Sequence, residues 1–327
     1  MEHKLMTERP KLFVTRPLPM NITDKLATDF ELTLRQEVTA LTPSEITHIF
    51  AAFDCVLTTF GDVFSASDFK SNQRCLLLAN YGVGYSHIDI QAAKAAGVTV
   101  TITPGAVTEA TADIAMMLML MAGRRASEGE ACVRAGEWTG WHPNQYLGQH
   151  ITGKTLGIIG MGRIGQAVAT RAHFGFRMNV VFFNRSQVIP LDLPDARQLN
   201  TISEVMAQSD FIQICVPGGV GTYHLIGAKE LASMQAHGVI INTSRGEVID
   251  ETALINALVN HQIFAAGLDV YENEPIIPKA LSNLPNVTLL PHMGTSVLEV
   301  RELMGMLVID SLRAFIAGKP IPNVVSH

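Results

Sequence analysis

The segment "GIIGMGRIGQAVA", residues 157–169, decides the fold. It places three glycines directly after an apolar run and before a stretch that suits a helix. The spacing Gly-x-Gly-x-x-Gly predicts a strand–turn–helix unit whose backbone approaches a pyrophosphate, and the helix N-terminus adds N–H groups for the phosphates. An ordinary turn between strand and helix is the alternative, because glycine-rich turns are common. The residues expected at a dinucleotide are Gly160, Gly162, Arg163, Ile164 and Gly165.

Short apolar runs alternate with helical stretches on both sides of this segment. Residues 151–292 contain TLGIIG, NVVFFN, FIQICV, GVIINT, AAGLDV and VTLLP, and residues 11–103 contain KLFVT, ELTL, DCVLTT, CLLLAN and VTVTI. This alternation predicts an α/β protein of two doubly wound parallel-sheet domains, Rossmann-like or flavodoxin-like, with an active-site cleft between them. We expect a dinucleotide-binding domain at 104–294 and a discontinuous substrate domain at 1–103 plus 295–327, completed by a last helix at about 295–317. A helix near 107–124, apolar nearly all round, is expected to be buried or to lie at a subunit interface.

Composition limits the classes of partner. Hydrophobic residues make up 47% and charged residues 17% of the 327 residues, which is enough for large buried cores. The net charge of −6 argues against nucleic acid, because that binding needs a basic surface. No apolar signal segment begins the sequence, and the longest apolar run, at 114–122, is too short to span a bilayer, so no membrane partner is expected. The four cysteines form no Cys-x-x-Cys pair, which favours a reduced, cytoplasmic protein without a metal site.

The residues after the run NVVFF indicate which dinucleotide binds. NAD-selective sites usually place Asp or Glu here to hold the ribose 2′-hydroxyl. This chain has Asn184, Arg185 and Ser186 instead, and the next carboxylate is Asp192. A guanidinium suits a 2′-phosphate, and a serine hydroxyl adds a second donor. We therefore expect NADP(H) as the preferred cofactor, with NAD(H) possible if Arg185 is only a solvated surface residue.

Four side chains suited to keto-acid reduction follow later apolar runs. Such an enzyme needs a cation for the substrate carboxylate and an acid that protonates the developing alkoxide. The segment NTSRGEVID supplies Arg245, GLDVYENEP supplies Asp269 and Glu274, and LLPHMG supplies His292. All four follow predicted strands, where ligands of open α/β sheets bind. Taken singly, each could instead be a surface, loop or capping residue.

Together these segments resemble the D-isomer-specific 2-hydroxyacid dehydrogenase family. The resemblance covers nearly the whole chain and includes NYGVGYSHID at 80–89, TPGAVTEATADIA at 103–115 and the glycine-rich segment. TPGAVTEATAD and FFNRS are most similar to the glyoxylate/hydroxypyruvate reductase branch. The resemblance implies that Arg245 binds the substrate carboxylate and that His292 is the general acid. It also implies that Glu274 accepts a hydrogen bond from the other imidazole nitrogen.

The same resemblance implies further contacts in the site. Asp269 would hold the nicotinamide carboxamide, and backbone N–H groups around Val83 and Gly84 would hold the substrate carboxylate, since glycine permits a close approach. The other residues implied at the cofactor are Val216, Pro217, Thr222, Thr243, Ser244, His292 and Gly294. The residues implied at the substrate are Tyr81, Val83, Gly84, Trp141, Arg245 and His292.

The loop "GEWTGWHPNQYLG" at 136–148 bears on assembly. In the reductase branch a tryptophan of this loop can reach into the partner's active site, and Trp141 matches it, with Trp138 as the alternative. A tryptophan packed at the interface without touching substrate is equally compatible with the sequence. The resemblance implies a homodimer whose interface is supplied mostly by the apolar helix near 107–124.

The sequence thus predicts an NADPH-preferring reductase of small 2-keto acids, with glyoxylate and hydroxypyruvate as the first candidates. Two other interpretations stay open. One is an NAD(H)-dependent enzyme of the family acting on another keto acid, of the D-lactate type or bulkier. The other is a dinucleotide sensor that binds protein partners without turnover.

Overall fold

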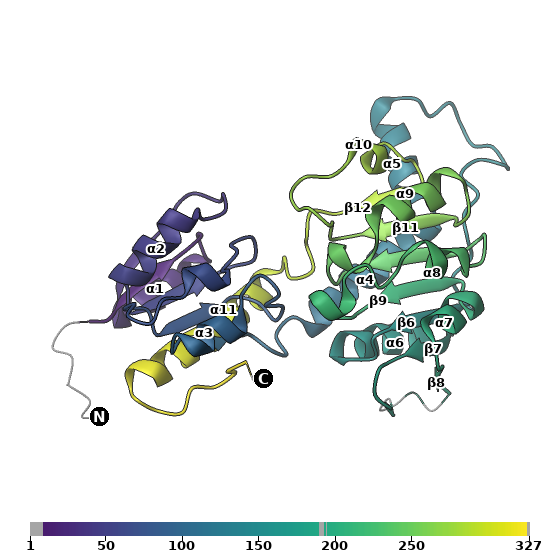
Figure 1. Ribbon diagram of the computed structural model, residues 1–327. Coiled ribbons are helices and arrows are strands. Elements are labelled where there is room, and N and C mark those ends of the chain that lie inside the picture. Colours follow the sequence, from purple (N-terminus) through teal and green to yellow (C-terminus); the bar gives the residue numbers. More distant parts are fainter. Residues whose placement is uncertain (1–8, 190–192, 194, 326–327) are drawn as a thin grey trace. The chain divides into compact units, whose positions relative to one another are not determined.

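The computed structural model describes residues 9–189, 193 and 195–325. They form two compact units, one made of the residues up to Val107 together with those from Thr295 on, the other of Thr108–Gly294. Each unit has its own parallel sheet flanked by helices, which confirms the predicted fold class (Figure 1).

The first unit is built on a five-stranded parallel sheet. Its strands are β1 (Lys11–Val14), β2 (Glu31–Leu34), β3 (Cys55–Thr58), β4 (Leu77–Asn80) and β5 (Thr99–Thr101). Their order in the sheet is β2-β1-β3-β4-β5, the flavodoxin-like order. The strands β1, β3 and β4 are buried almost throughout, as expected of a sheet covered on both faces.

The helices of this unit are α1 (Met20–Asp29), α2 (Pro43–Ala52), α3 (Ile90–Ala95) and α11 (Leu298–Ile316). Helix α2 begins at Pro43 because Thr42 caps it and Glu45 completes a capping box. Helix α11 joins the unit from the far end of the chain and packs on α1 and β4. The contact with α1 is close, because a Cβ added to Gly305 would lie 2.6 Å from Ile22. The first unit therefore needs both ends of the sequence to complete its core.

The second unit is built on a seven-stranded parallel sheet. Its strands are β6 (Thr155–Ile159), β7 (Asn179–Phe183), β8 (Arg197–Gln198), β9 (Phe211–Ile214), β10 (Val239–Asn242), β11 (Ala265–Leu268) and β12 (Val287–Leu289). Their order is β12-β11-β10-β9-β6-β7-β8. From β6 the strands are added toward one edge up to β8, and from β9 they are added toward the other edge. The switch point therefore lies between β6 and β9, which is where doubly wound sheets bind ligands.

The helices of the second unit are α4 (Thr108–Gly123), α5 (Ala126–Ala135), α6 (Arg163–Phe176), α7 (Ile202–Gln208), α8 (Ala228–Ala232), α9 (Glu251–Val259) and α10 (Lys279–Ser282). Successive strand residues point to opposite faces, so Ile158 packs with α4 and α6 while Ile159 packs with α7, α8 and α9. Nine of the sixteen residues of α4 are buried, since the helix packs beside α6 and against β10 and β11 in the core of its own unit.

One strand of this sheet escapes the sequence pattern. The two residues of β8, Arg197 and Gln198, pair with β7 at the sheet edge. A run so short and polar carries no apolar signal, so six strands are predicted where the structure has seven.

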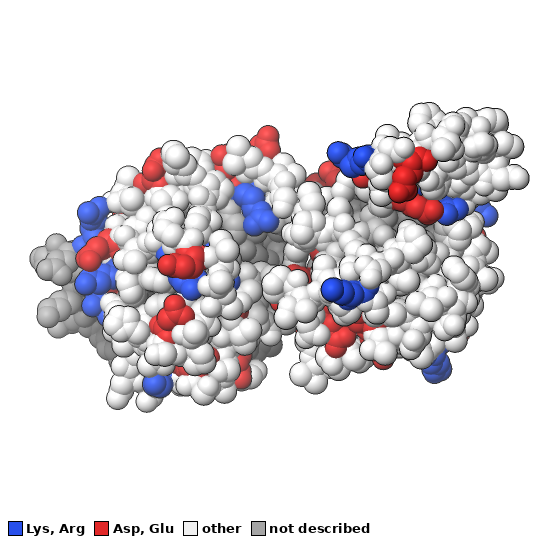
Figure 2. Space-filling model, turned by 90° about the horizontal axis from the view of Figure 1, so that it is seen from above, with Lys and Arg blue, Asp and Glu red and all other residues white. Residues whose placement is uncertain are grey.

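Two surface features bear on partners. Within the described ranges no helix has both the length and the apolar character needed to cross a membrane. On the face drawn in Figure 2, Lys and Arg side chains are interspersed with those of Asp and Glu.

Candidate active site

All strands of the second unit run parallel, so their carboxyl ends meet at one edge of the sheet. The sequence-predicted residues of this unit follow six of the strands at this edge. Trp138 and Trp141 are the exceptions, because they lie in the segment after α5. Gly160 follows β6, Asn184 follows β7, and Val216 lies in the loop after β9. The remaining three groups are Thr243–Arg245 after β10, Asp269 after β11, and His292 after β12. Parallel topology alone therefore gathers cofactor and catalytic candidates at one edge.

The glycine-rich turn fits a pyrophosphate. Gly160 has φ +100°, and a Cβ placed there would lie 2.8 Å from the Cys215 carbonyl oxygen, so only glycine suits the switch point. A Cβ on Gly165 would lie 2.4 Å from the Gly160 carbonyl oxygen, so this glycine lets α6 pack on the turn. Gly162 is the N-cap of α6, and no atom lies within 4 Å of a Cβ built there. The N-terminus of this 14-residue helix is therefore open to an anion.

The loop after β7 is held by the edge strand that the sequence did not predict. The Gln198 amide nitrogen donates to the carbonyl oxygens of Asn184 (3.1 Å) and Ser186 (3.0 Å), and the Asn184 amide donates to the Ser186 hydroxyl at 3.1 Å. Arg185 is exposed and, among the described residues, makes no ion pair or hydrogen bond. The loop is thus fixed while its guanidinium stays available to a ligand.

The loops after β9 and β10 carry further residues expected at the cofactor. Thr222 donates from its hydroxyl to the Pro217 carbonyl oxygen at 2.6 Å, which closes the loop that contains Val216. Thr243 is nearly buried and accepts a hydrogen bond from Gln213 at 2.9 Å. The first contact holds the backbone of its loop, and the second fixes the Thr243 side chain.

His292 and Glu274 form a hydrogen-bonded pair. The imidazole Nδ1 lies 2.8 Å from the Glu274 carboxylate. Both side chains are mostly buried. The other carboxylate oxygen accepts the Tyr271 backbone N–H at 3.0 Å, so Glu274 cannot swing away without breaking a second bond. This arrangement fixes the orientation of the imidazole through Nδ1.

Asp269 holds the loop that carries His292. Its two carboxylate oxygens accept the backbone N–H groups of Met293 (2.6 Å) and Gly294 (2.8 Å), and its own carbonyl accepts the His292 N–H at 3.0 Å. Burial raises the pKa of Asp269, while these N–H groups and the nearby imidazole oppose that rise. Asp269 was expected to bind the nicotinamide carboxamide, and here its oxygens already accept backbone hydrogen bonds.

Arg245 occupies a closely packed position after β10. Its guanidinium donates to the Ser244 carbonyl oxygen at 2.6 Å, and burial lowers its pKa against the opposing charges of Glu274 and Glu247. A Cβ on Gly246 would lie 1.8 Å from the Tyr271 carbonyl carbon, and one on Gly218 would lie 2.8 Å from Arg245. Both glycines allow neighbouring loops to touch the arginine segment. Neither was predicted, although Gly246 directly follows Arg245 in the sequence.

In the first unit, the expected substrate residues follow β4. Tyr81 is buried, its hydroxyl donates to the Arg301 carbonyl oxygen of α11, and burial raises its pKa to about 12. Val83 and Gly84 are partly exposed, and within the described residues their N–H groups have no hydrogen-bond partner. Of these three residues, the last two present main-chain donors and Tyr81 anchors the loop.

Comparison with known proteins places this arrangement in a family. Residues 116–294 match the family model described as D-isomer specific 2-hydroxyacid dehydrogenase, NAD binding domain. The chain belongs to this family. A glyoxylate reductase of Thermococcus litoralis is 40% identical over 322 residues, covering 97% of each chain. Relatives of this name support the predicted glyoxylate reductase branch of the D-isomer-specific 2-hydroxyacid dehydrogenases, and this chain is an NAD(P)-dependent oxidoreductase.

Solved structures of the same family have the same fold. A 2-hydroxyacid dehydrogenase from Polaromonas is 37% identical, with a TM-score of 0.90, covering 97% of this chain and 100% of that one. An NADPH-dependent glyoxylate/hydroxypyruvate reductase from Sinorhizobium meliloti, in complex with NADP and malonate, is 31% identical, with a TM-score of 0.86 and coverage of 98% and 97%. Nicotinamide dinucleotides are therefore the cofactor class of this 2-hydroxyacid dehydrogenase.

Helix α5 and the segment after it form an exposed arm of this dehydrogenase, residues 126–148. No residue of α5 is buried, and the side chain of Trp141 is 79% exposed. Trp138 and Leu147 are exposed as well. The arm thus presents apolar side chains outside the core of its own unit.

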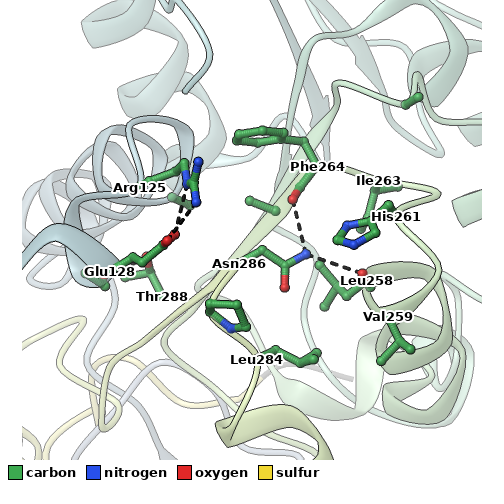
Figure 3. A pocket seen from close by; sticks show the side chains of 15 residues that line it. Arg125, Glu128, Leu258, Val259, His261, Ile263, Phe264, Leu284, Asn286 and Thr288 are labelled. Carbon is green, nitrogen blue, oxygen red and sulfur yellow. Dashed lines mark hydrogen bonds and ion pairs between the residues drawn. The ribbon is translucent and has the colours of Figure 1, made fainter. Parts of the chain in front are cut away.

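A pocket at the opposite end of the strands does not belong to this site. Its volume is about 460 Å³, and its lining includes Asn286, which directly precedes β12 (Figure 3). Several of its polar groups are paired: Arg125 with Glu128 at 2.7 Å, and the Asn286 amide with the carbonyl oxygens of Phe264 and Leu258. Pairing of this kind leaves these groups engaged within the protein.

Proposed function

We propose that this dehydrogenase is an NADPH-preferring reductase of small 2-keto acids, glyoxylate and hydroxypyruvate, to 2-hydroxy acids. The main observation behind the proposal is the His292–Glu274 pair. It lies at the carboxyl edge of a sheet whose glycine-rich turn leaves room for a pyrophosphate. The printed names of the relatives, glyoxylate reductase and glyoxylate/hydroxypyruvate reductase, support the substrate class.

In the proposed reaction, the bound reduced nicotinamide supplies the hydride. Nε2 of His292 gives its proton to the keto oxygen, and Glu274 stabilises the imidazolium and then the neutral ring. Arg245 binds the substrate carboxylate and polarises the keto oxygen, since its planar fork matches a carboxylate. Asp269 keeps the His292 loop in place through its two backbone hydrogen bonds.

The preference for NADPH rests on the loop after β7. Its exposed Arg185 attracts a 2′-phosphate, Ser186 adds a hydroxyl, and residues 184–189 contain no carboxylate that would repel a phosphate. NAD(H) binding remains the competing outcome of the cofactor comparison below.

The homodimer is also a proposal. The arm at 126–148 exposes apolar side chains, and Ile114, Met117 and Leu120 of α4 are only partly buried in their own unit. Burial of this surface against a second copy would stabilise a two-fold pair, and Trp141 would contribute to the partner's substrate site.

The test is a matrix of cofactors and substrates. Purified protein is assayed by loss of reduced-nicotinamide absorbance, with NADPH and NADH against glyoxylate, hydroxypyruvate, pyruvate and phenylpyruvate. We expect the highest kcat/KM for NADPH with the two small substrates. Faster turnover of pyruvate or phenylpyruvate would reassign the substrate, and dinucleotide binding without any turnover would favour a sensor.

A further inference from the structure

One asparagine ends a strand in each unit and shapes the loop that follows. Asn242 ends β10 and Asn80 ends β4, and each is only 1% exposed. The Asn242 amide donates to the Arg245 carbonyl oxygen at 2.9 Å, and its oxygen accepts the Ser244 N–H and hydroxyl at 3.0 and 2.8 Å. Asn242 thus shapes the loop that carries Arg245, and Asn80 stands at the equivalent place in the other sheet.

Asn80 gathers two carbonyl groups of its loop. Its amide nitrogen donates to the carbonyl oxygens of Gly82 and Gly84, both at 3.1 Å. In a trans peptide the C=O and N–H point in opposite directions. The first bond therefore turns the Val83 N–H away from Asn80, and the second does the same for Tyr85. Neither N–H has a hydrogen-bond partner among the described residues.

The two carbonyls differ in how far they depend on Asn80. The Gly82 oxygen also accepts the Thr103 backbone N–H at 3.0 Å, so this peptide is held twice. For the Gly84 oxygen, the described residues supply only the Asn80 amide. The direction of the Tyr85 N–H therefore depends on Asn80 more strongly than that of Val83.

The Asn80 amide oxygen differs from the amide nitrogen in its contacts. The oxygen is buried and has no partner among the residues that the structure describes. An unpartnered buried acceptor is unfavourable, so the contribution of this side chain comes from its nitrogen. Rotating the amide by 180° would set that oxygen against two carbonyl oxygens, which fixes the orientation.

We propose that Asn80 is a positioning residue for substrate: it holds the Gly82 and Gly84 carbonyls so that the Val83 and Tyr85 N–H groups bind the carboxylate of a 2-keto acid. The identity of that substrate rests on the proposed function, while the orientation of the N–H groups rests on the hydrogen bonds alone. Two N–H donors on one side of a loop suit an anion that has two oxygens.

The test removes the donor and adds one negative charge. Asn80→Asp keeps the shape of the side chain and converts its nitrogen to oxygen. Asn72→Asp is the matched control, because it makes the same change of charge at an exposed turn of the same unit. We measure kcat and KM for glyoxylate, Ki for oxamate as a non-reducible carboxylate analogue, and Kd for NADPH.

Asn80→Asp loses both hydrogen bonds, but Thr103 still holds the Gly82 carbonyl. We therefore expect KM and Ki to rise together by about 10-fold, the scale of the lost Gly84 hydrogen bond, with a smaller change in kcat and no change in the Kd for NADPH. The control should match the wild type in all four quantities. A folded variant with unchanged KM and Ki would overturn the proposal, and so would a fall in kcat alone.

Two further arms keep the outcomes distinct. If Asn80→Asp does not fold, Asn80→Ser leaves one small donor and should raise KM and Ki less steeply, and unchanged values would overturn the proposal. If the wild type reduces none of the keto acids, the proposed function fails. Oxamate binding then decides the inference by itself: weaker binding in the variant supports it, and equal binding or none in either protein overturns it.

Discussion

Two loops of this molecule follow the same design and expose different chemistry. The loop after β10 in the second unit presents a side chain, Arg245, while the loop after β4 in the first presents main-chain N–H groups. Both are shaped by an asparagine at the strand end, but only Asn242 has partners for both ends of its amide among the described residues. A site made by a side chain can be predicted from the residue type in the sequence. A site made by main-chain N–H groups cannot, because it depends on which residue orients the peptides.

The largest effect should come from a side chain of the second unit. His292→Ala removes the proposed proton donor and should lower kcat by about 10³-fold, the scale of general acid catalysis, with little change in NADPH binding. His237→Ala is the control, because His237 also pairs with a carboxylate, Asp210, at 2.7 Å but at the opposite end of the strands. Steady-state rates close to wild type in the His292 variant would remove this residue from the mechanism.

Arg245→Lys tests the geometry of the cation separately from its charge. A lysine keeps the charge but cannot form two parallel hydrogen bonds to a carboxylate, so kcat/KM for glyoxylate should fall by about 10²-fold. Arg313→Lys makes the same change at an exposed ion pair with Asp29 and should leave the kinetics unaltered. If Arg245→Lys leaves kcat/KM as unaltered as Arg313→Lys does, the loop after β10 contributes only a positive charge and no hydrogen-bond geometry.

Asp269→Asn tests whether a main-chain clamp also operates in the second unit. The amide can accept only one of the two N–H groups from Met293 and Gly294, so the His292 loop should loosen and kcat should fall by roughly 10-fold. Asp54→Asn is a suitable control, since Asp54 accepts the Lys11 N–H at 2.8 Å away from this edge. If the KM for NADPH rises by a larger factor than kcat falls, the result would instead support the carboxamide role expected from the resemblance.

The smallest effect on turnover should come from the loop after β7, where a substitution changes mainly which dinucleotide is preferred. Arg185→Asp should lower the ratio of kcat/KM for NADPH over NADH by about 10-fold or more, because a carboxylate repels the 2′-phosphate. Lys229→Asp on α8 makes the same change of charge at an exposed site and controls for the general field. An unaltered ratio in the Arg185 variant would show that the loop after β7 does not read the phosphate.

The sequence predicts the parts of the molecule whose residue types are distinctive. The glycine turn, the His292–Glu274 pair and eleven of the twelve strands in the described part of the chain carry local patterns, and the structure contains them. Strand β8 and Gln198 escape because two polar residues have no periodicity. Asn80 escapes because an asparagine after an apolar run is read as a turn residue, and its partners become visible only when the peptides are oriented. The contacts of Asp269 depend on a loop 24 residues further along the chain.

The return of α11 to the first unit has a consequence for biosynthesis. Met304, Val308, Ile309 and Leu312 are buried, so the residues up to Val107, about a third of the chain, leave the ribosome before the helix that covers their sheet has been made. Thr108–Gly294 is synthesised without interruption and can fold as a unit during translation. The segment translated first can therefore complete its core only after α11 has been made.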